Sequence, residues 1–161
     1  MNRFKEHVYI IPEDDRDRQI AVGFVRHHGV KDDPIKVMPP AGGWPNVLKT
    51  FKDEYVQKLR NNEKAHVVML IDFDEQFEDR KKKFDDAIPS ELKERVFVIG
   101  SKNTPETLGA ALNKTARKIG EALAEDCDAG RAGDWGHEQL AHNEPERKRL
   151  EETVKPFLFE K

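Results

Sequence analysis

An apolar run leads directly into carboxylates in the sequence VVMLIDFDEQ, residues 67–76. Asp72 and Asp74 follow the run and are separated by one phenylalanine. If the run is a strand, its side chains alternate between two faces, so both carboxylates of this D-x-D pair should point the same way. Carboxylate oxygens are the hard ligands that Mg2+ or Mn2+ prefers, so the pair is a candidate metal site.

Acidic residues also follow two other apolar runs. HVYII (7–11) leads to Glu13, with Asp17 four residues further on, and RVFVIG (95–100) precedes Glu106. If these runs are parallel strands of one sheet, all three acidic sets lie at one edge, where a divalent cation would offset the repulsion between like charges. These acidic sets are Glu13 with Asp14, Asp15 and Asp17 behind it, Asp72 with Asp74, and Glu106.

The elements that would position these acids are four short runs rich in Val and Ile. They cover residues 7–11, 35–38, 66–71 and 95–100. None alternates strictly with polar residues, and continuous apolar runs are typical of parallel strands buried on both faces.

Helix-like patterns separate or follow these strands. Apolar residues recur at helical spacing in 15–28, 44–62 and 104–127. Strand and helix in alternation predict an α/β fold: a mostly parallel four-stranded sheet flanked by helices, with right-handed crossovers. We expect one domain over 1–161, with a core at about 7–110 and a helical C-terminal extension at about 111–161. The expected anchors of that extension are Trp135, Leu140, Leu150, Phe157, Leu158 and Phe159.

Over about residues 7–110, this pattern resembles the Toprim fold, and in particular the OLD-type and related small Toprim-like nucleases. Residues 13–17 match the E-G-x-[ST]-[DE] motif at its first and last acids, with Asp14 in place of glycine and Arg16 in place of the hydroxyl residue. Residues 72–74 correspond to the later D-x-D. Residues 104–106, Thr-Pro-Glu, resemble the S-x-E motif, and AGGW (41–44) resembles the glycine-containing turn after the second strand.

The resemblance implies Mg2+- or Mn2+-dependent phosphodiester chemistry on DNA or RNA. It implies that Glu13 acts as general acid/base or as a ligand. Asp72 and Asp74 would hold one or two metals, and Asp17 and Glu106 would complete a second site. Such cations activate a water and stabilise the leaving oxygen.

Each motif also has a purely structural interpretation. Asp72 and Asp74 could be solvated loop acids, and the acids of 14–17 could complement the dipole at a helix N-terminus. Thr104 with Glu106 reads equally well as an N-cap and first turn. The RKKK run (80–83) is more typical of a solvated helix face or loop than of a phosphate-binding edge.

Composition limits the classes of protein further. The chain is 37% charged and its net charge is −3, so no overall basic field draws it to nucleic acid. The single cysteine, Cys127, excludes an internal disulfide and a multi-cysteine zinc site. No signal-type segment and no run of 18 apolar residues is present, so we expect a cytoplasmic protein without a membrane partner. HEQLAH (137–142) spaces its histidines five apart, not the four that a zinc-protease helix needs.

Two rival functions remain open at this point. One is a non-catalytic Toprim-like binding or regulatory subunit, with an ATPase as its protein partner, because the chain has no phosphate-binding loop of its own. The other is a doubly wound domain that binds a small phosphorylated ligand and does not need the acids.

Overall fold

The computed structural model describes residues 1–159 and confirms the predicted α/β class. Its four strands are β1 (His7–Pro12), β2 (Ile35–Val37), β3 (Ala65–Leu70) and β4 (Val96–Ile99). They form one all-parallel sheet in the order β2-β1-β3-β4. All four strands lie within a residue or two of the predicted runs, because Val- and Ile-rich segments of this length favour buried strands.

Helices connect the strands and follow the last one. Before β4 these are α1 (Asp15–Val25), α2 (Trp44–Thr50), a π-helical turn (Phe51–Tyr55), α3 (Val56–Asn61), α4 (Phe77–Ala87) and a 3-10 helix (Ser90–Arg95). After β4 come α5 (Pro105–Leu112), α6 (Ala116–Ala129), two 3-10 turns (Gly133–Gly136 and Ala141–Asn143), α7 (Glu144–Thr153) and α8 (Lys155–Leu158). The C-terminal helices confirm the predicted helical extension.

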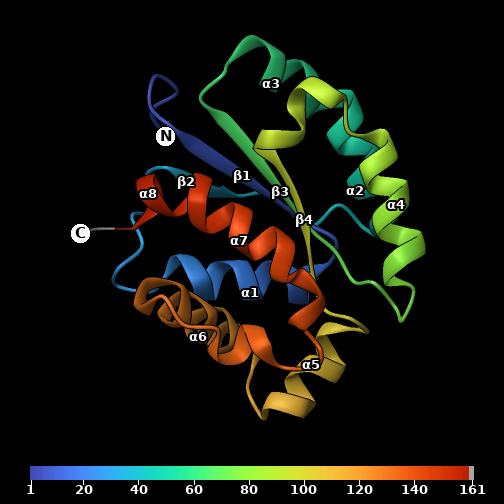
Figure 1. Cartoon of the computed structure of the whole chain (residues 1–161), viewed down its shortest axis with the longest axis vertical. Helices are drawn as coiled ribbons and strands as arrows, with labels where there is room; N and C mark the ends of the chain where they lie inside the picture. Colours follow the sequence, from blue (N-terminus) through green and yellow to red (C-terminus); the bar gives the residue numbers. More distant parts are fainter. Residues whose placement is uncertain (160–161) are drawn as a thin grey trace.

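The two faces of the sheet bury alternate residues of the same strands. Tyr9 and Met69 belong to an apolar cluster with side chains of α2, α3 and α4, whereas Val8 and Val68 belong to a second cluster with side chains of α1, α6 and α8. Figure 1 shows the sheet between these two helical layers, with α2, α3 and α4 on one side and α1, α6 and α7 on the other. Strands buried on both faces explain why the apolar runs are continuous.

Two glycines let α1 and α6 pack with their backbones in close contact. A Cβ added to Gly23 would lie 2.0 Å from the carbonyl oxygen of Arg117, and one added to Gly120 would lie 1.9 Å from that of Ile20. Real Cβ atoms do not approach backbone so closely, so this contact requires glycine at both positions.

The single helical stretch predicted over 104–127 is wrong. The chain forms two helices there, because Asn113 adopts the left-handed conformation with φ 52° and ends α5. Thr115 then caps α6 by accepting a hydrogen bond from the backbone N–H of Lys118. Asparagine tolerates the left-handed region better than most residues, so it can end a helix in place of glycine.

The predicted anchors of the C-terminal extension are in contact with the core. Trp135, Leu140, Leu158 and Phe159 are buried, and Leu150 and Phe157 pack partly buried against the cluster on the α1 face. The indole Nε1 of Trp135 donates a 3.1 Å hydrogen bond to the carbonyl oxygen of Leu123. Among the described residues, no helix combines the length and the apolar character needed to cross a bilayer.

Candidate metal centre

The strand order creates a switch point between β1 and β3. From β1 the chain crosses to β2 on one side, whereas from β3 it crosses to β4 on the other side. In open parallel sheets, ligands bind just beyond the carboxyl ends of the strands where the connections diverge in this way. The residues that follow β1 and β3 are those that the sequence analysis selected, Glu13 and Asp72.

Backbone pairing beyond the strands holds these two residues together. The backbone N–H of Glu13 donates to the carbonyl oxygen of Leu70 at 2.9 Å, so the ladder between β1 and β3 continues by one residue. A carboxylate oxygen of Glu13 accepts a 3.0 Å hydrogen bond from the backbone N–H of Asp72. The half-buried Glu13 is thereby fixed above the end of β3, beside the buried Asp72.

The first turn of α1 supplies a third acid. Asp14 is the N-cap of this helix, and its side chain accepts a 2.9 Å hydrogen bond from the backbone N–H of Asp17. The cap directs the helix away from the end of β1, and Asp17 lies on its inner side with only 1% of its surface exposed. Asp14 therefore lies at a helix N-terminus, as the structural interpretation expected, and its side chain caps the helix and positions Asp17.

Glu13, Asp17 and Asp72 form one compact group. One carboxylate oxygen from each of the three residues lies within 4.8 Å of the other two. Asp17 and Asp72 are buried, at 1% and 5% exposure. One oxygen of Asp17, Oδ2, is buried without a hydrogen-bond partner among the described residues. Buried carboxylate oxygens normally have partners, so the group is incomplete as a hydrogen-bonded cluster.

Burial and mutual repulsion change the proton affinity of all three acids. Burial raises the pKa of Asp17 far above its usual range, and the neighbouring charges of Asp72 and Asp14 raise it further. Burial also raises the pKa of Asp72, with a contribution from the charge of Glu13. For Glu13, burial raises the pKa and outweighs the hydrogen bond from the backbone N–H of Asp72, which lowers it. Three carboxylates therefore cannot all be ionised here at neutral pH unless a cation neutralises them.

The donor set fits a hard divalent cation. All three side chains offer oxygen, and no histidine or cysteine belongs to the group. Oxygen-only ligands suit Mg2+, Mn2+ or Ca2+ better than Zn2+ or copper. The partnerless Oδ2 of Asp17 is a donor atom that such an ion would use.

Asp74 and Glu106, the other two predicted ligands, lie outside this group. The regular alternation expected for the D-x-D pair ends after Asp72, because β3 stops at Leu70 and Asp74 adopts φ 47° in a turn. Asp74 instead accepts a 2.6 Å hydrogen bond from Arg80, although its charge still raises the pKa of Glu13.

The carboxylate of Glu106 is more than half exposed and pairs with Arg16 at 3.1 Å. Its place in the first turn of α5, behind the N-cap Thr104, agrees with the helix-start interpretation.

Two further residues contact the group and were not predicted to do so. Arg80 is buried and donates to both the backbone oxygen of Asp72 (2.8 Å) and the carboxylate of Asp74. The buried Ser101 makes a long 3.5 Å contact to a carboxylate oxygen of Asp72. Ser101 could have been proposed, because it directly follows the fourth apolar run. Arg80 gave no such signal within its run of four basic residues.

The other three basic residues of that run lie on α4 and pair along the helix. Lys81 contacts Asp85, Lys82 contacts Asp86, and Lys83 contacts Asp79. These local pairs agree with a solvated helix face for 81–83, and Arg80 is the exception to it.

Comparison with known proteins gives no indication of function, so a functional assignment depends on the geometry of the site. No family model, curated protein or solved structure matches this chain.

Proposed function

We propose that this chain binds a divalent cation, Mg2+ or Mn2+, through Glu13, Asp17 and Asp72, and that it cleaves phosphodiester bonds in DNA or RNA. The observation that carries the proposal is the convergence of three carboxylates, two of them buried, at the switch point of a parallel sheet. When bound there, the cation would supply charge neutralisation and a more acidic water.

The three acids differ in burial, and this difference suggests their roles. Asp17 and Asp72 are buried and suit the task of holding the cation. Glu13 is only half-buried, so a substrate can reach it more easily than it can reach the two aspartates. Burial raises the pKa of Glu13 toward neutral pH, where a group that both gives and takes a proton works best. The Toprim resemblance of residues 13–17 and 72–74 supports the same assignment.

The partly buried Trp44 and the exposed Lys83 near Glu13 offer an aromatic and a basic contact for nucleic acid, whereas the buried Arg80 already donates to Asp72 and Asp74. The backbone N–H of Gly42 donates to the carbonyl oxygen of Glu13 at 2.9 Å, and Trp44 follows in the same turn. Over the ring of Trp44 lie the guanidinium carbon of Arg80, at 4.9 Å, and the ammonium nitrogen of Lys83, at 5.3 Å. Aromatic rings flanked by cations are typical of surfaces that bind single strands.

The proposal is tested by incubating the protein with single- and double-stranded DNA and RNA in Mn2+ or Mg2+. We expect cleavage that a chelator stops and that Asp72→Asn reduces by roughly a hundredfold or more, because a buried ligand is lost. Glu106→Gln is the matched control: it also removes one acid near a strand end, but one that lies outside the group, and its activity should stay within about twofold of wild type. Equal activity in wild type and Asp72→Asn would contradict the proposal.

A second function is favoured by the depth of the site. Asp17 and Asp72 are almost inaccessible, which suits a cation that stabilises the fold of a binding or regulatory subunit. Such a subunit would act with a partner, an ATPase in the Toprim comparison. Mn2+ would then raise the melting temperature of the wild type but not of Asp72→Asn, while all nucleic acid substrates stay intact. Because the one cysteine, Cys127, is a free thiol, we place either function in the reducing cytoplasm.

A further inference from the structure

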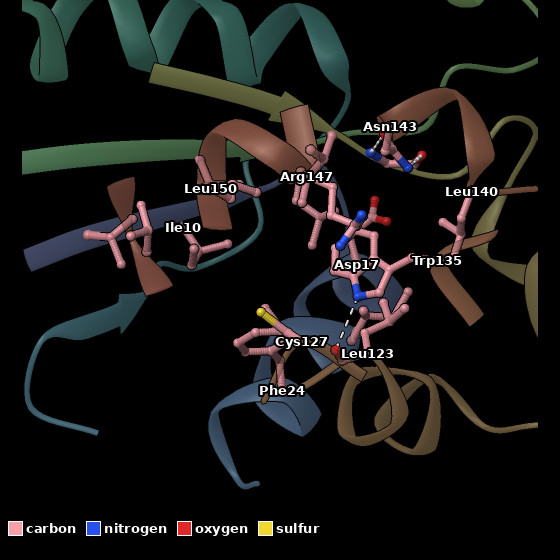
Figure 2. A pocket seen from close by; sticks show the side chains of 18 of the residues that line it. Ile10, Asp17, Phe24, Leu123, Cys127, Trp135, Leu140, Asn143, Arg147 and Leu150 are labelled. Atoms are coloured by element: carbon pink, nitrogen blue, oxygen red, sulfur yellow. Dashed lines mark hydrogen bonds between the residues drawn. The ribbon is translucent and has the colours of Figure 1, made fainter. Parts of the chain in front are cut away.

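A cavity lies on the α1 face of the sheet, separate from the rim at Glu13. It has a volume of about 120 Å³ and is lined by sheet residues such as Ile10 and Val68 and by helical residues such as Phe24, Leu123 and Leu150. Figure 2 shows these helical side chains around it, with the ring of Trp135 and the thiol of Cys127 on its wall. Apolar cavities of about 150 Å³ stay dry and bind molecules the size of benzene.

Among the lining residues that the structure describes, Asp17 is the one acid. Figure 2 places its side chain among the apolar residues that line the cavity. Only 1% of the surface of Asp17 is exposed, and its Oδ2 has no hydrogen-bond partner among the described residues. A polar group in an apolar cavity favours a ligand that carries one hydrogen-bonding group at the matching end.

Besides the carboxyl of Asp17, two basic residues of the described chain line the cavity, Arg147 and Lys155. Arg147 lines it, but its guanidinium already pairs with Glu144 at 2.7 Å and with Glu151 at 3.2 Å. The rest of the lining is mostly apolar, and an anion would lie against the carboxyl of Asp17, so both features favour an uncharged ligand. Cys127 adds no charge, because burial raises the pKa of its thiol to about 11.

We infer that this cavity binds a small uncharged ligand: an apolar body about the size of a benzene ring with one hydroxyl group that hydrogen-bonds to Asp17. The inference goes beyond the proposed cation chemistry, since it would hold for a protein that cleaves nothing. The two sites share Asp17, so binding at one is coupled to binding at the other.

Phenol and toluene form a matched pair of probes, because they have nearly the same size and differ in the hydroxyl group. Titration of the protein in EDTA, followed by NMR chemical shifts, should give saturable binding of phenol. The resonances of lining residues such as Ala21 and Leu123 should move. In Asp17→Leu the ratio of the phenol to the toluene dissociation constant should rise at least tenfold, because the hydroxyl group loses its partner in an apolar site.

Two further variants keep the test decisive. Ala21→Leu adds three carbons at the cavity wall and should weaken both probes at least tenfold; if Asp17→Leu does not fold, this variant and the shift map carry the test. Glu13→Gln removes a proposed cation ligand that does not line the cavity, and it should keep phenol binding within about twofold. Loss of cation binding with retained phenol binding would therefore separate the two sites. Failure of phenol to bind, or an unchanged probe ratio in Asp17→Leu, would overturn the inference.

Discussion

The two faces of the sheet are packed in different ways. On the α2–α4 face, large side chains such as Phe51, Phe84 and Leu59 are completely buried. On the α1 face, the helices meet through Gly23 and Gly120, and the packing leaves a cavity of about 120 Å³. The first face is close-packed apolar structure, and the second combines tight backbone contacts with unfilled space and a buried acid. One face is therefore filled by large apolar side chains, whereas the other retains unfilled space beside a buried carboxyl.

The largest effect should come from truncating an aromatic side chain on the close-packed face. Phe51→Ala should lower the free energy of unfolding by about 3–5 kcal/mol, because it removes a completely buried ring. Phe24→Ala is the matched change on the other face and should cost about half as much, because Phe24 is only partly buried and already borders the cavity. Urea denaturation measures both, and equal losses would contradict the comparison.

The next largest effect should come from the helix contact on the α1 face. Gly120→Ala places a methyl group against the carbonyl oxygen of Ile20, and we expect a loss of about 1–3 kcal/mol in the free energy of unfolding. Gly136→Ala is the control, because its nearest neighbour would lie at an ordinary 3.7 Å. The control should stay within about 0.5 kcal/mol of wild type. If thermal melts show Gly120→Ala to be as stable as the control, the close contact is not a constraint.

An effect of opposite sign, which grows with pH, should come from Asp17. Folding raises the pKa of Asp17, so the protonated carboxyl stabilises the folded protein. This stabilisation is fully present below the unfolded pKa of 3.8 and is lost as the pH rises. In EDTA, Asp17→Asn should therefore gain on wild type as the pH increases from 4 to 8, by up to about 1.4 kcal/mol in the free energy of unfolding for each pH unit. Melts across this pH range measure the difference, and a constant difference would argue against a buried, protonated Asp17.

Added Mn2+ should reverse that order. The cation stabilises only the protein that can bind it, so at pH 8 wild type should gain more in melting temperature than Asp17→Asn does. If both proteins gain equally, Asp17 is not a ligand.

The sheet was predictable because its strands carry a strong local signal. Four Val- and Ile-rich runs mark the strands, and continuous apolar character identifies a parallel sheet. The strand ends then indicate Glu13 and Asp72, because the carboxyl ends of parallel strands lie at one edge. Asp17 was indicated by the Toprim resemblance, as the last acid of residues 13–17.

The remaining details depend on side-chain geometry that spacing does not encode. Asp74 turns toward Arg80, and Glu106 turns toward Arg16, through local ion pairs. The left-handed Asn113, which divides the predicted helix, is likewise one conformation among several that asparagine adopts. The cavity arises from how several helices pack together, so no short motif indicates it.

The cation site is tested most directly by anomalous diffraction from a crystal of this protein soaked in Mn2+. We predict one strong anomalous peak within about 2.0–2.3 Å of carboxylate oxygens of Glu13, Asp17 and Asp72. A well-ordered crystal with no peak at these three residues, or with a peak only beside Asp74 or Glu106, would contradict the account.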